Sequence, residues 1–248
     1  MRHDARIGVV IPAFNEAGAI ALVIREIPNW VDQIVVADNA STDGTGDIAK
    51  AAGARVVRED EPGYGAACLA GISALDECDV VVFVDGDHSD YPEDMAALVD
   101  PIVQGDRDLM IASRALGNVE RGALTLPQRF GNWLATRLIE VIWRAHYTDL
   151  GPFRAIRFAA LQELGMRDRN FGWTVEMQIR AAEKALVHGE VPARYRRRIG
   201  RSKVSGTVKG TLMAGYKILL IIAVHAARRG RRHDRRKPVK PADRSAIG

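Results

Sequence analysis

The stretch VVVFVDGDHSDYPEDM, residues 80–95, begins with an apolar run and ends in a group of carboxylates. The run from Val80 to Val84 is typical of a strand that a sheet buries on both faces. Asp85 and Asp87 follow it one residue apart, and two like charges at that spacing raise each other's pKa. We therefore expect a positively charged group to lie between these two carboxylates.

Three earlier apolar runs show the same arrangement. Polar residues end or directly follow the runs at 7–14, 33–39 and 54–60, and each run precedes a segment whose apolar residues have helical spacing. This alternation predicts an α/β fold in which helices cover both faces of a mostly parallel central sheet. Ligands bind at the carboxyl ends of such strands, which is where the unusual polar clusters of the first half lie.

The second half of the chain has a less regular pattern. We expect strands over residues 108–115 and 189–198, helices over 127–145 and 173–186, and a short strand joined to a helix over 149–165. No internal repeat interrupts this order.

Length and composition limit the number of domains. The chain has 248 residues, 47% of them apolar and 27% charged, which allows one large α/β domain or two small ones. We expect residues 1–207 to form the main domain, followed by an apolar or amphipathic helix over 208–227. Residues 228–248 contain nine Lys or Arg against two Asp, which predicts a disordered basic tail.

Several features indicate the compartment. Cys68 and Cys78 imply no disulfide framework, so a reducing cytoplasm is the simplest location. The N-terminus does not resemble a signal peptide, and the apolar stretch at 211–227 is shorter than the about 20 residues of a spanning helix. A helix and a basic tail supply two membrane signals, which predicts a peripheral position on the cytoplasmic face. The helix could instead pack on the main domain or form a homodimer, and no nucleic-acid partner is expected.

The polar clusters disfavour several kinds of site. No GxGxxG follows the first strand and no GxxxxGK[ST] loop is present, which argues against dinucleotide and P-loop chemistry. No spacing of His and Cys indicates zinc. Two aspartates separated by Gly86 suit a hard divalent cation, Mg²⁺ or Mn²⁺, whose shell phosphate oxygens complete. In the alternative interpretation, Asp87 and Asp90 only cap a helix that begins near Pro92.

Five ordered motifs extend this interpretation. VVIPAFNE, VVADNASTDGT, RVVREDEPGYGAACLAGI, VVVFVDGDHSD and LMIASR resemble those of family 2 glycosyltransferases. The similarity covers roughly residues 7–227 and includes TDLGPFRAIR, FGWTVEMQIRAA and RRRIGRSK. It is strongest to the branch of dolichyl-phosphate mannose and glucose synthases and bacterial polyprenyl-phosphate glycosyltransferases. The resemblance implies a GT-A fold and metal-dependent, inverting transfer of a hexose from a UDP- or GDP-sugar to a polyprenyl phosphate.

The resemblance also implies roles for individual residues. Asp85 and Asp87 would hold Mg²⁺ or Mn²⁺, and Ser89 stands where that branch often has a metal-assisting Gln. The expected catalytic residues are Asp87, Arg114, Arg129 and Asp149. The expected nucleotide-sugar contacts are Pro12, Phe14, Asn15, Glu16, Asp38, Ser41, Asp43, Arg58, Gly63, Tyr64, Gly65, Asp85 and Gly86. The expected acceptor contacts are Arg114, Arg129, Trp173, Glu176, Arg197, Ser202 and Lys203.

The nature of the acceptor separates two enzymatic hypotheses. A phosphate acceptor is already anionic at neutral pH and needs positive charges to hold it, whereas a hydroxyl acceptor needs a general base. Asp149 is the candidate base for a soluble hydroxyl acceptor in glycan or glycolipid synthesis. A nucleotidyltransferase is disfavoured because PAFNE is not a basic Gly-rich loop, and a non-catalytic scaffold because the metal and phosphate groups are all present.

Overall fold

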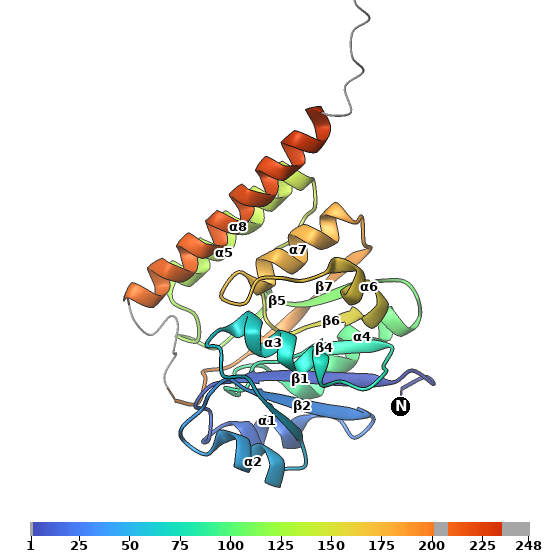
Figure 1. Cartoon of the computed structure of the whole chain (residues 1–248), viewed down its shortest axis with the longest axis vertical. Coiled ribbons are helices and arrows are strands. Elements are labelled where there is room, and N and C mark those ends of the chain that lie inside the picture. Colours follow the sequence, from blue (N-terminus) through green and yellow to red (C-terminus); the bar gives the residue numbers. More distant parts are fainter. Residues whose placement is uncertain (1, 201–207, 235–248) are drawn as a thin grey trace, which may run out of the picture.

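The computed structural model describes residues 2–200 and 208–234 and shows one central sheet with helices on both faces (Figure 1). In this part of the chain, seven strands lie in the order β3-β2-β1-β4-β6-β5-β7. The predicted α/β fold with a mostly parallel sheet is confirmed. The strands are β1 (Ile7–Ala13), β2 (Gln33–Asp38), β3 (Arg55–Arg58), β4 (Val80–Phe83), β5 (Leu109–Val119), β6 (Arg154–Arg157) and β7 (His188–Tyr195).

The first four strands are parallel, and their register brings their carboxyl ends to one edge of the sheet. Val10 of β1 pairs with Val35 of β2 and with Phe83 of β4. Three residues further on, Ala13 pairs with Asp38. The polar residues that follow these strands therefore lie next to one another, although they are far apart in the sequence.

The remaining strands differ in direction and length from the expectation. β6 is antiparallel to both of its neighbours, β4 and β5, whereas β5 and β7 are parallel. β5 continues to Val119, beyond residue 115, because Asn118 and Val119 pair with β7 after a shift in register. β7 ends at Tyr195, so the three arginines that follow it leave the sheet.

The core has two parts, one on each face of the sheet. Val80 and Val82 of β4 belong to one cluster and Val81 and Phe83 to the other, and all four are buried. Because successive strand residues point to opposite faces, this double burial explains the unbroken apolar run. The first cluster packs against α1 (Ile20–Glu26), α2 (Thr45–Ala51) and α4 (Ala96–Val103), and the second against α3 (Tyr64–Ser73), α5 (Leu126–Trp143), α6 (Phe158–Leu164) and α7 (Trp173–Glu183); a 3₁₀ turn, η1 (Pro92–Met95), precedes α4.

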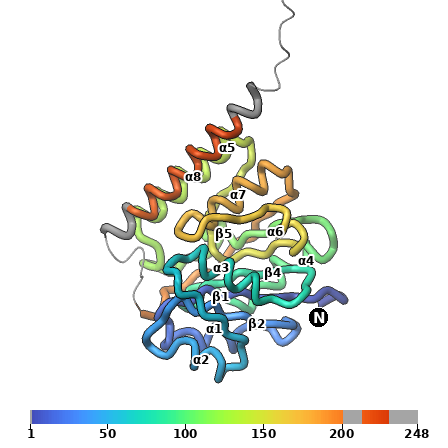
Figure 2. The backbone as a smooth tube through the Cα atoms, viewed as in Figure 1, coloured from blue at the N-terminus to red at the C-terminus, as the bar shows by residue number. Residues whose placement is uncertain are grey.

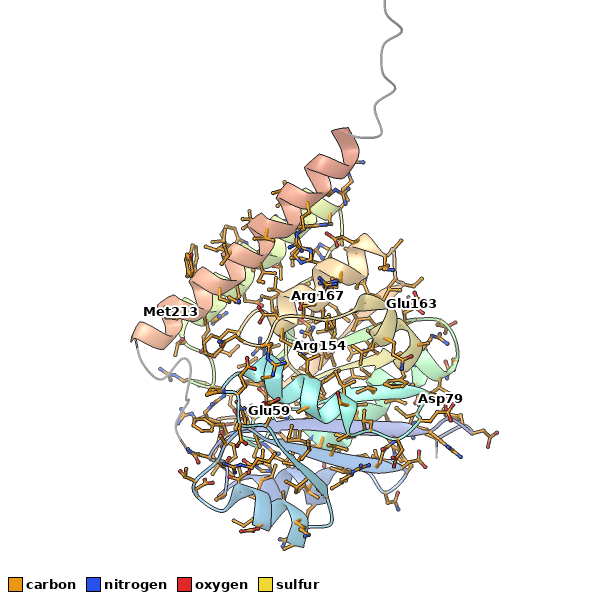
Figure 3. The ribbon with its side chains drawn as sticks, viewed as in Figure 1. Glu59, Asp79, Arg154, Glu163, Arg167 and Met213 are labelled. Carbon is orange, nitrogen blue, oxygen red and sulfur yellow. The ribbon has the colours of Figure 1, made fainter. Side chains whose placement is uncertain are left out.

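The helix α8 (Val208–Asp234) packs along α5 and α7 (Figure 2). Ile222 is buried in the second cluster, and Ile218 and Ile221 pack against it. Figure 3 shows Met213 near the N-terminal end of α8 and Arg154 near the middle of the domain. The helix continues past residue 227, so the start of the expected basic tail is helical, while residues 235–248 lie outside the described residues. Among the described helices, none is both long and apolar enough to cross a membrane.

Candidate active site

A cleft of about 1680 Å³ opens beyond the carboxyl ends of β1 and β4. One wall consists of the loops after β1, β2 and β4, and the other of β5, α5 and α8. The predicted residues that line it are Pro12, Phe14, Glu16, Gly63, Tyr64, Asp85, Gly86, Asp87, Arg114, Arg129 and Asp149.

Three of the predicted nucleotide contacts join the loops after β1 and β2 to each other. The backbone N–H of Asn15 donates to Ser41 Oγ at 2.9 Å, and Asn15 Oδ1 accepts from the backbone N–H of Thr42 at 2.9 Å. Asp43 Oδ2 accepts from the N–H of Ala17 at 3.1 Å. Asn15 has a φ of 53°, a strained value for a residue with a side chain. These side chains shape the cleft from behind its lining.

Asp38 and Arg58 also lie behind the lining, while Asn39 reaches the cleft. Asp38 is 6% exposed, and its carboxylate lies 3.6 Å from Arg58 Nη1. Asn39 Oδ1 accepts from the N–H of Gly63 at 2.8 Å, and its amide donates to two backbone carbonyls after β3. Asn39 was not among the predicted site residues, although it ends the strand predicted over residues 33–39. It ties the β3–α3 loop to the end of β2.

Gly63, which precedes α3, and Gly65, in its first turn, allow a close approach of backbone rather than of a ligand. A Cβ on Gly63 would lie 2.0 Å from the carbonyl oxygen of Arg169, and one on Gly65 would lie 2.0 Å from that of Asp168. The N–H of Gly65 donates to the carbonyl of residue 170 at 3.2 Å. The role expected for Gly65 at the nucleotide is thus corrected: it packs the loop of residues 168–170 against α3. Tyr64, between the glycines, faces the cleft.

Three carboxyl groups gather after β4. Burial and the neighbouring Asp87 raise the pKa of Asp85 to about 7, although Tyr64 donates to Asp85 Oδ1 at 3.0 Å. Burial, together with the charges of Asp85 and Asp87, raises the pKa of Asp90 well above its ordinary value. Asp87 forms an ion pair with Arg198. The positive charge expected beside these acids is therefore supplied, in this structure, by a guanidinium.

The donor atoms of this group suit a hard divalent cation that brings further oxygen ligands with it. Asp85 and Asp87 offer carboxylate oxygens, and Asp90 Oδ2 is buried with no hydrogen-bond partner. Within residues 2–200 and 208–234, no group of three or more His, Cys, Asp or Glu is arranged to hold a metal by itself. Mg²⁺ and Mn²⁺ often bind through one or two carboxylates plus substrate phosphates, and the residues present fit that arrangement.

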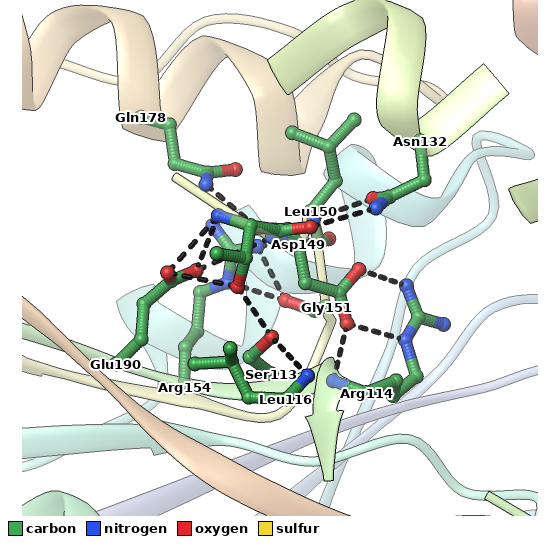
Figure 4. A network of polar contacts seen from close by, with 11 residues as sticks. Ser113, Arg114, Leu116, Asn132, Asp149, Leu150, Gly151, Arg154, Gln178 and Glu190 are labelled. Atoms are coloured by element: carbon green, nitrogen blue, oxygen red, sulfur yellow. Dashed lines mark hydrogen bonds and ion pairs between the residues drawn. The ribbon is translucent and has the colours of Figure 1, made fainter. Parts of the chain in front are cut away.

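Arg114 and Asp149 form a buried pair on the opposite wall (Figure 4). Asp149 is 1% exposed; its Oδ2 accepts from Arg114 N and Nε and its Oδ1 from Arg114 Nη2, each at 2.7 Å. Burial alone would lower the pKa of Arg114, but the charge and hydrogen bonds of Asp149 raise it. Both carboxylate oxygens of Asp149 are thus engaged by one arginine. The geometry therefore disfavours Asp149 as a general base and makes it a positioning residue for Arg114.

The segment that carries Asp149 is held from three sides (Figure 4). Glu190 of β7 accepts from the backbone N–H groups of residues 148 and 149, and Gln178 of α7 donates to the carbonyl of residue 149 at 2.9 Å. Asn132 of α5 donates to the carbonyl of residue 148 and accepts from the N–H of residue 150. Several elements thus fix the position of the Arg114 guanidinium.

Two predicted acceptor contacts belong to the core. Trp173 is 1% exposed and packs edge-on against Phe83 with 6.1 Å between ring centroids. Glu176 is 3% exposed and pairs with Arg180 at 2.8 Å. The expectation that Trp173 and Glu176 wall the acceptor side is wrong, because α7 turns both of them inward. Ser202 and Lys203 lie outside the described residues.

The arginines after β7 lie in different environments, one outside the cleft lining and one within it. Arg197 Nε donates to the carbonyl of Arg121 at 2.8 Å, at the rim and not among the residues that line the cleft. Arg198 lines the cleft and was not predicted. Arg196 binds the His88 carbonyl and Glu26 instead, so three successive arginines have three different sets of partners. Nothing in the letters RYRRRIG distinguishes Arg198 from its neighbours.

Comparisons with known proteins show similarity along most of the chain. Residues 8–165 match the model of the family described as glycosyl transferase family 2. An uncharacterized glycosyltransferase of Mycobacterium tuberculosis is 35% identical over 217 residues, covering 86% of this chain and 96% of the relative. A dolichyl-phosphate hexose transferase of Haloferax volcanii is 33% identical over 204 residues, covering 80% of this chain and 86% of the relative. Glucosyl-3-phosphoglycerate synthase from Mycobacterium tuberculosis, in complex with Mn²⁺, UDP and glucosyl-3-phosphoglycerate, shares the fold with a TM-score of 0.72 at 23% identity, covering 90% of this chain and 81% of that chain.

Proposed function

Because the chain belongs to glycosyl transferase family 2 and is an enzyme with the GT-A fold, we propose that it moves a hexose from a UDP- or GDP-sugar to a polyprenyl phosphate, with inversion and with Mg²⁺ or Mn²⁺. The observation that carries the choice of acceptor is the pair of Arg114 and Asp149. Asp149 holds the Arg114 guanidinium in a fixed position at the cleft. The same hydrogen bonds occupy the carboxylate that would otherwise be the candidate base. The resemblance to a dolichyl-phosphate hexose transferase supports the same choice.

On the donor side, the acids after β4 would bind the cation that accompanies the diphosphate. Asp85 and Asp87 would hold it, and once bound it neutralises charge that develops on the departing nucleoside diphosphate. Phe14 is 43% exposed and lines the cleft beside Pro12, so it offers an aromatic face to the nucleobase. Asp38 does not line the cleft, and Asn39, which does, is 7% exposed and uses its side chain to hold the β3–α3 loop, so it would act on the nucleoside site by positioning Gly63.

On the acceptor side, guanidinium groups would bind the phosphate and direct one of its oxygens at the anomeric carbon. Arg114 faces the cleft from β5 and Arg129 from α5. Bidentate binding to a guanidinium suits a phosphate group. Since a phosphate oxygen is already anionic at neutral pH, this attack requires no proton transfer to an enzyme base, which agrees with the engaged state of Asp149.

Apolar side chains beside the cleft favour delivery of the acceptor from a membrane surface. Leu126, Phe130 and Trp133 of α5 are 79%, 61% and 55% exposed, and Met213 and Tyr216 of α8 are 52% and 63% exposed. Other residues of the same helical turns line the cleft. Exposed aromatic and aliphatic groups of this kind insert into the headgroup boundary of a bilayer. The Phe130→Ser, Trp133→Ser double variant should bind anionic vesicles less well than the unaltered protein in a flotation assay.

A mass-spectrometric assay tests the proposed reaction. The protein is incubated with Mn²⁺, a pool of UDP- and GDP-sugars and a short polyprenyl phosphate in detergent. A glycosylated lipid of defined added mass, absent from the Asp87→Asn control, is the expected result. Release of UDP or GDP without a lipid product would contradict the lipid acceptor and favour a soluble hydroxyl acceptor.

A further inference from the structure

The Arg198 guanidinium occupies a position that it would have to leave before a metal ion could bind Asp87. Its guanidinium pairs with Asp87, which is 4% exposed, and the other oxygen of that carboxylate accepts from the N–H of Ser89 at 2.9 Å. Both oxygens of the second acid in the Asp85-Gly86-Asp87 motif are therefore engaged within the chain. A cation that binds Asp87 must compete with this guanidinium.

The backbone that carries Arg198 is held firmly against the loop after β4. The N–H of Arg196 donates to the carbonyl of Ser89 at 2.9 Å, and the N–H of Ile199 donates to the carbonyl of Asp87 at 3.0 Å. The Arg196 guanidinium binds the carbonyl of His88 at 2.7 Å. These bonds on both sides of Arg198 leave its side chain as the part that can move without disturbing the segment.

Arg198 and Asp87 both line the cleft, but the Arg198 side chain is the more exposed of the two. The Arg198 side chain is 30% exposed and that of Asp87 is 5% exposed. Arg198 lines the same cleft as Asp85, Glu16 and Tyr195. A rotation about its side-chain bonds would carry the guanidinium from Asp87 toward an anion bound in the cleft, and a nucleoside diphosphate is the anion that the cation site implies.

Charge balance determines when that rotation is favourable. With no ligand, moving Arg198 away would leave a buried carboxylate without a counter-charge, which is strongly unfavourable. A divalent cation arriving alone displaces the guanidinium but gives it no new partner. A cation arriving with a nucleoside diphosphate supplies both a replacement charge for Asp87 and a phosphate for Arg198.

We propose that Arg198 is an internal counter-ion that occupies Asp87 in the free enzyme and transfers to the diphosphate, so that metal binding depends on the nucleotide. The inference rests on the proposed function, because it takes Asp87 as a metal ligand. Coupling of this kind is reciprocal: Mn²⁺ tightens nucleotide binding by the same factor by which the nucleotide tightens Mn²⁺ binding. A purely structural pair would instead stabilise the loop and leave this coupling unchanged.

Calorimetric titration of the full chain with Mn²⁺, with and without saturating UDP or GDP, tests the proposal without any turnover. For the unaltered protein we expect the preferred nucleotide to tighten Mn²⁺ binding at least tenfold. Arg198→Gln should bind Mn²⁺ alone about tenfold more tightly, and the effect of the nucleotide should fall below threefold. Arg198→Lys keeps the charge and should stay close to the unaltered protein.

Arg194→Gln is the matched control, because it removes the same charge from an exposed arginine that pairs with Glu93 and Asp94 instead. It should leave both Mn²⁺ affinities unchanged, and thermal unfolding establishes that each variant is folded. If Arg198→Gln does not tighten Mn²⁺ binding, the inference is wrong but the proposed function is unaffected. Absence of Mn²⁺ binding in every variant, with UDP or GDP present, overturns it together with the metal dependence of the proposed function.

Discussion

Replacing Asp149 by Asn should impair the enzyme through Arg114 rather than through the loss of a base. Asp149 accepts three hydrogen bonds from Arg114, each 2.7 Å long. Hydrogen bonds to charged groups contribute about 1.5–3 kcal/mol each, and the amide keeps one acceptor oxygen while losing the other together with the charge. We therefore expect transition-state stabilisation to fall by about 2–3 kcal/mol, which lowers kcat/KM roughly 30- to 160-fold.

A double-mutant cycle with Arg114→Gln measures whether the two residues act together. The rate of lipid glycosylation is determined for the unaltered protein, each single variant and the double variant. If Asp149 acts by positioning Arg114, Asp149→Asn should cost less than about threefold in the Arg114→Gln background. Arg129→Ala is the control: Arg129 faces the cleft from α5, and its effect should add to that of Asp149→Asn. The acid limb of the pH profile of kcat/KM should be the same with and without Asp149.

An equal loss in both backgrounds would refute this reasoning. If the acid limb of the pH profile also disappeared in Asp149→Asn, Asp149 would be a general base, and the soluble hydroxyl acceptor would replace the lipid phosphate. Removing one partner of a buried ion pair costs about 3–5 kcal/mol of stability, so thermal unfolding must accompany each rate. Should Asp149→Asn unfold, Arg114→Lys provides the same comparison, because it keeps the charge and loses the planar fork.

Three further outcomes follow from other parts of the structure. Asp87→Asn should abolish detectable turnover while the variant still unfolds cooperatively on heating, and full activity would contradict the role of the motif. Gly65→Ala should lower the free energy of unfolding by several kcal/mol in a denaturant titration, because its Cβ would lie 2.0 Å from the Asp168 carbonyl oxygen; an unchanged midpoint would contradict that close packing. A hydrogen bond from Arg2 lowers the pKa of Asp100, so its contribution should be fully present above about pH 4, the ordinary Asp pKa, and be lost as pH falls through the lower folded value. The stability gap between the unaltered protein and Asp100→Asn should therefore close in acid, and a gap that widened would reverse the sign of this argument.

The sequence predicts the first half of the fold well because its strands are buried on both faces. Val80 to Phe83 form an unbroken apolar run, and alternate residues enter the two core clusters. The antiparallel β6 is less visible, because four residues, RAIR, carry little periodicity, and its direction is set by pairing with β4 and β5. Similarly, the extension of β5 depends on a partner strand about 75 residues later.

The location of a candidate site residue can be predicted from the sequence where strand register alone determines it. Asp85 and Asp87 follow a buried strand, so the register fixes their position at the edge of the sheet. Trp173 and Glu176 lie on α7, where the choice between cleft and core depends on how the helix is rotated against the sheet. Arg198 could be separated from Arg196 and Arg197 only once the structure showed which groups each arginine contacts.

The two walls of the cleft each offer a place for an anionic ligand, and this division supports a reaction between two anions. Asp85 and Asp87, from the first half of the chain, would attract a cation and through it a diphosphate. Arg114, from the second half, presents a guanidinium whose counter-ion Asp149 is buried behind it. Each anion would then meet a separate positive charge, which reduces their mutual repulsion as the sugar passes between them. Arg198 lies where the walls meet, so it is the residue through which occupancy of one wall would alter the charge presented to the other.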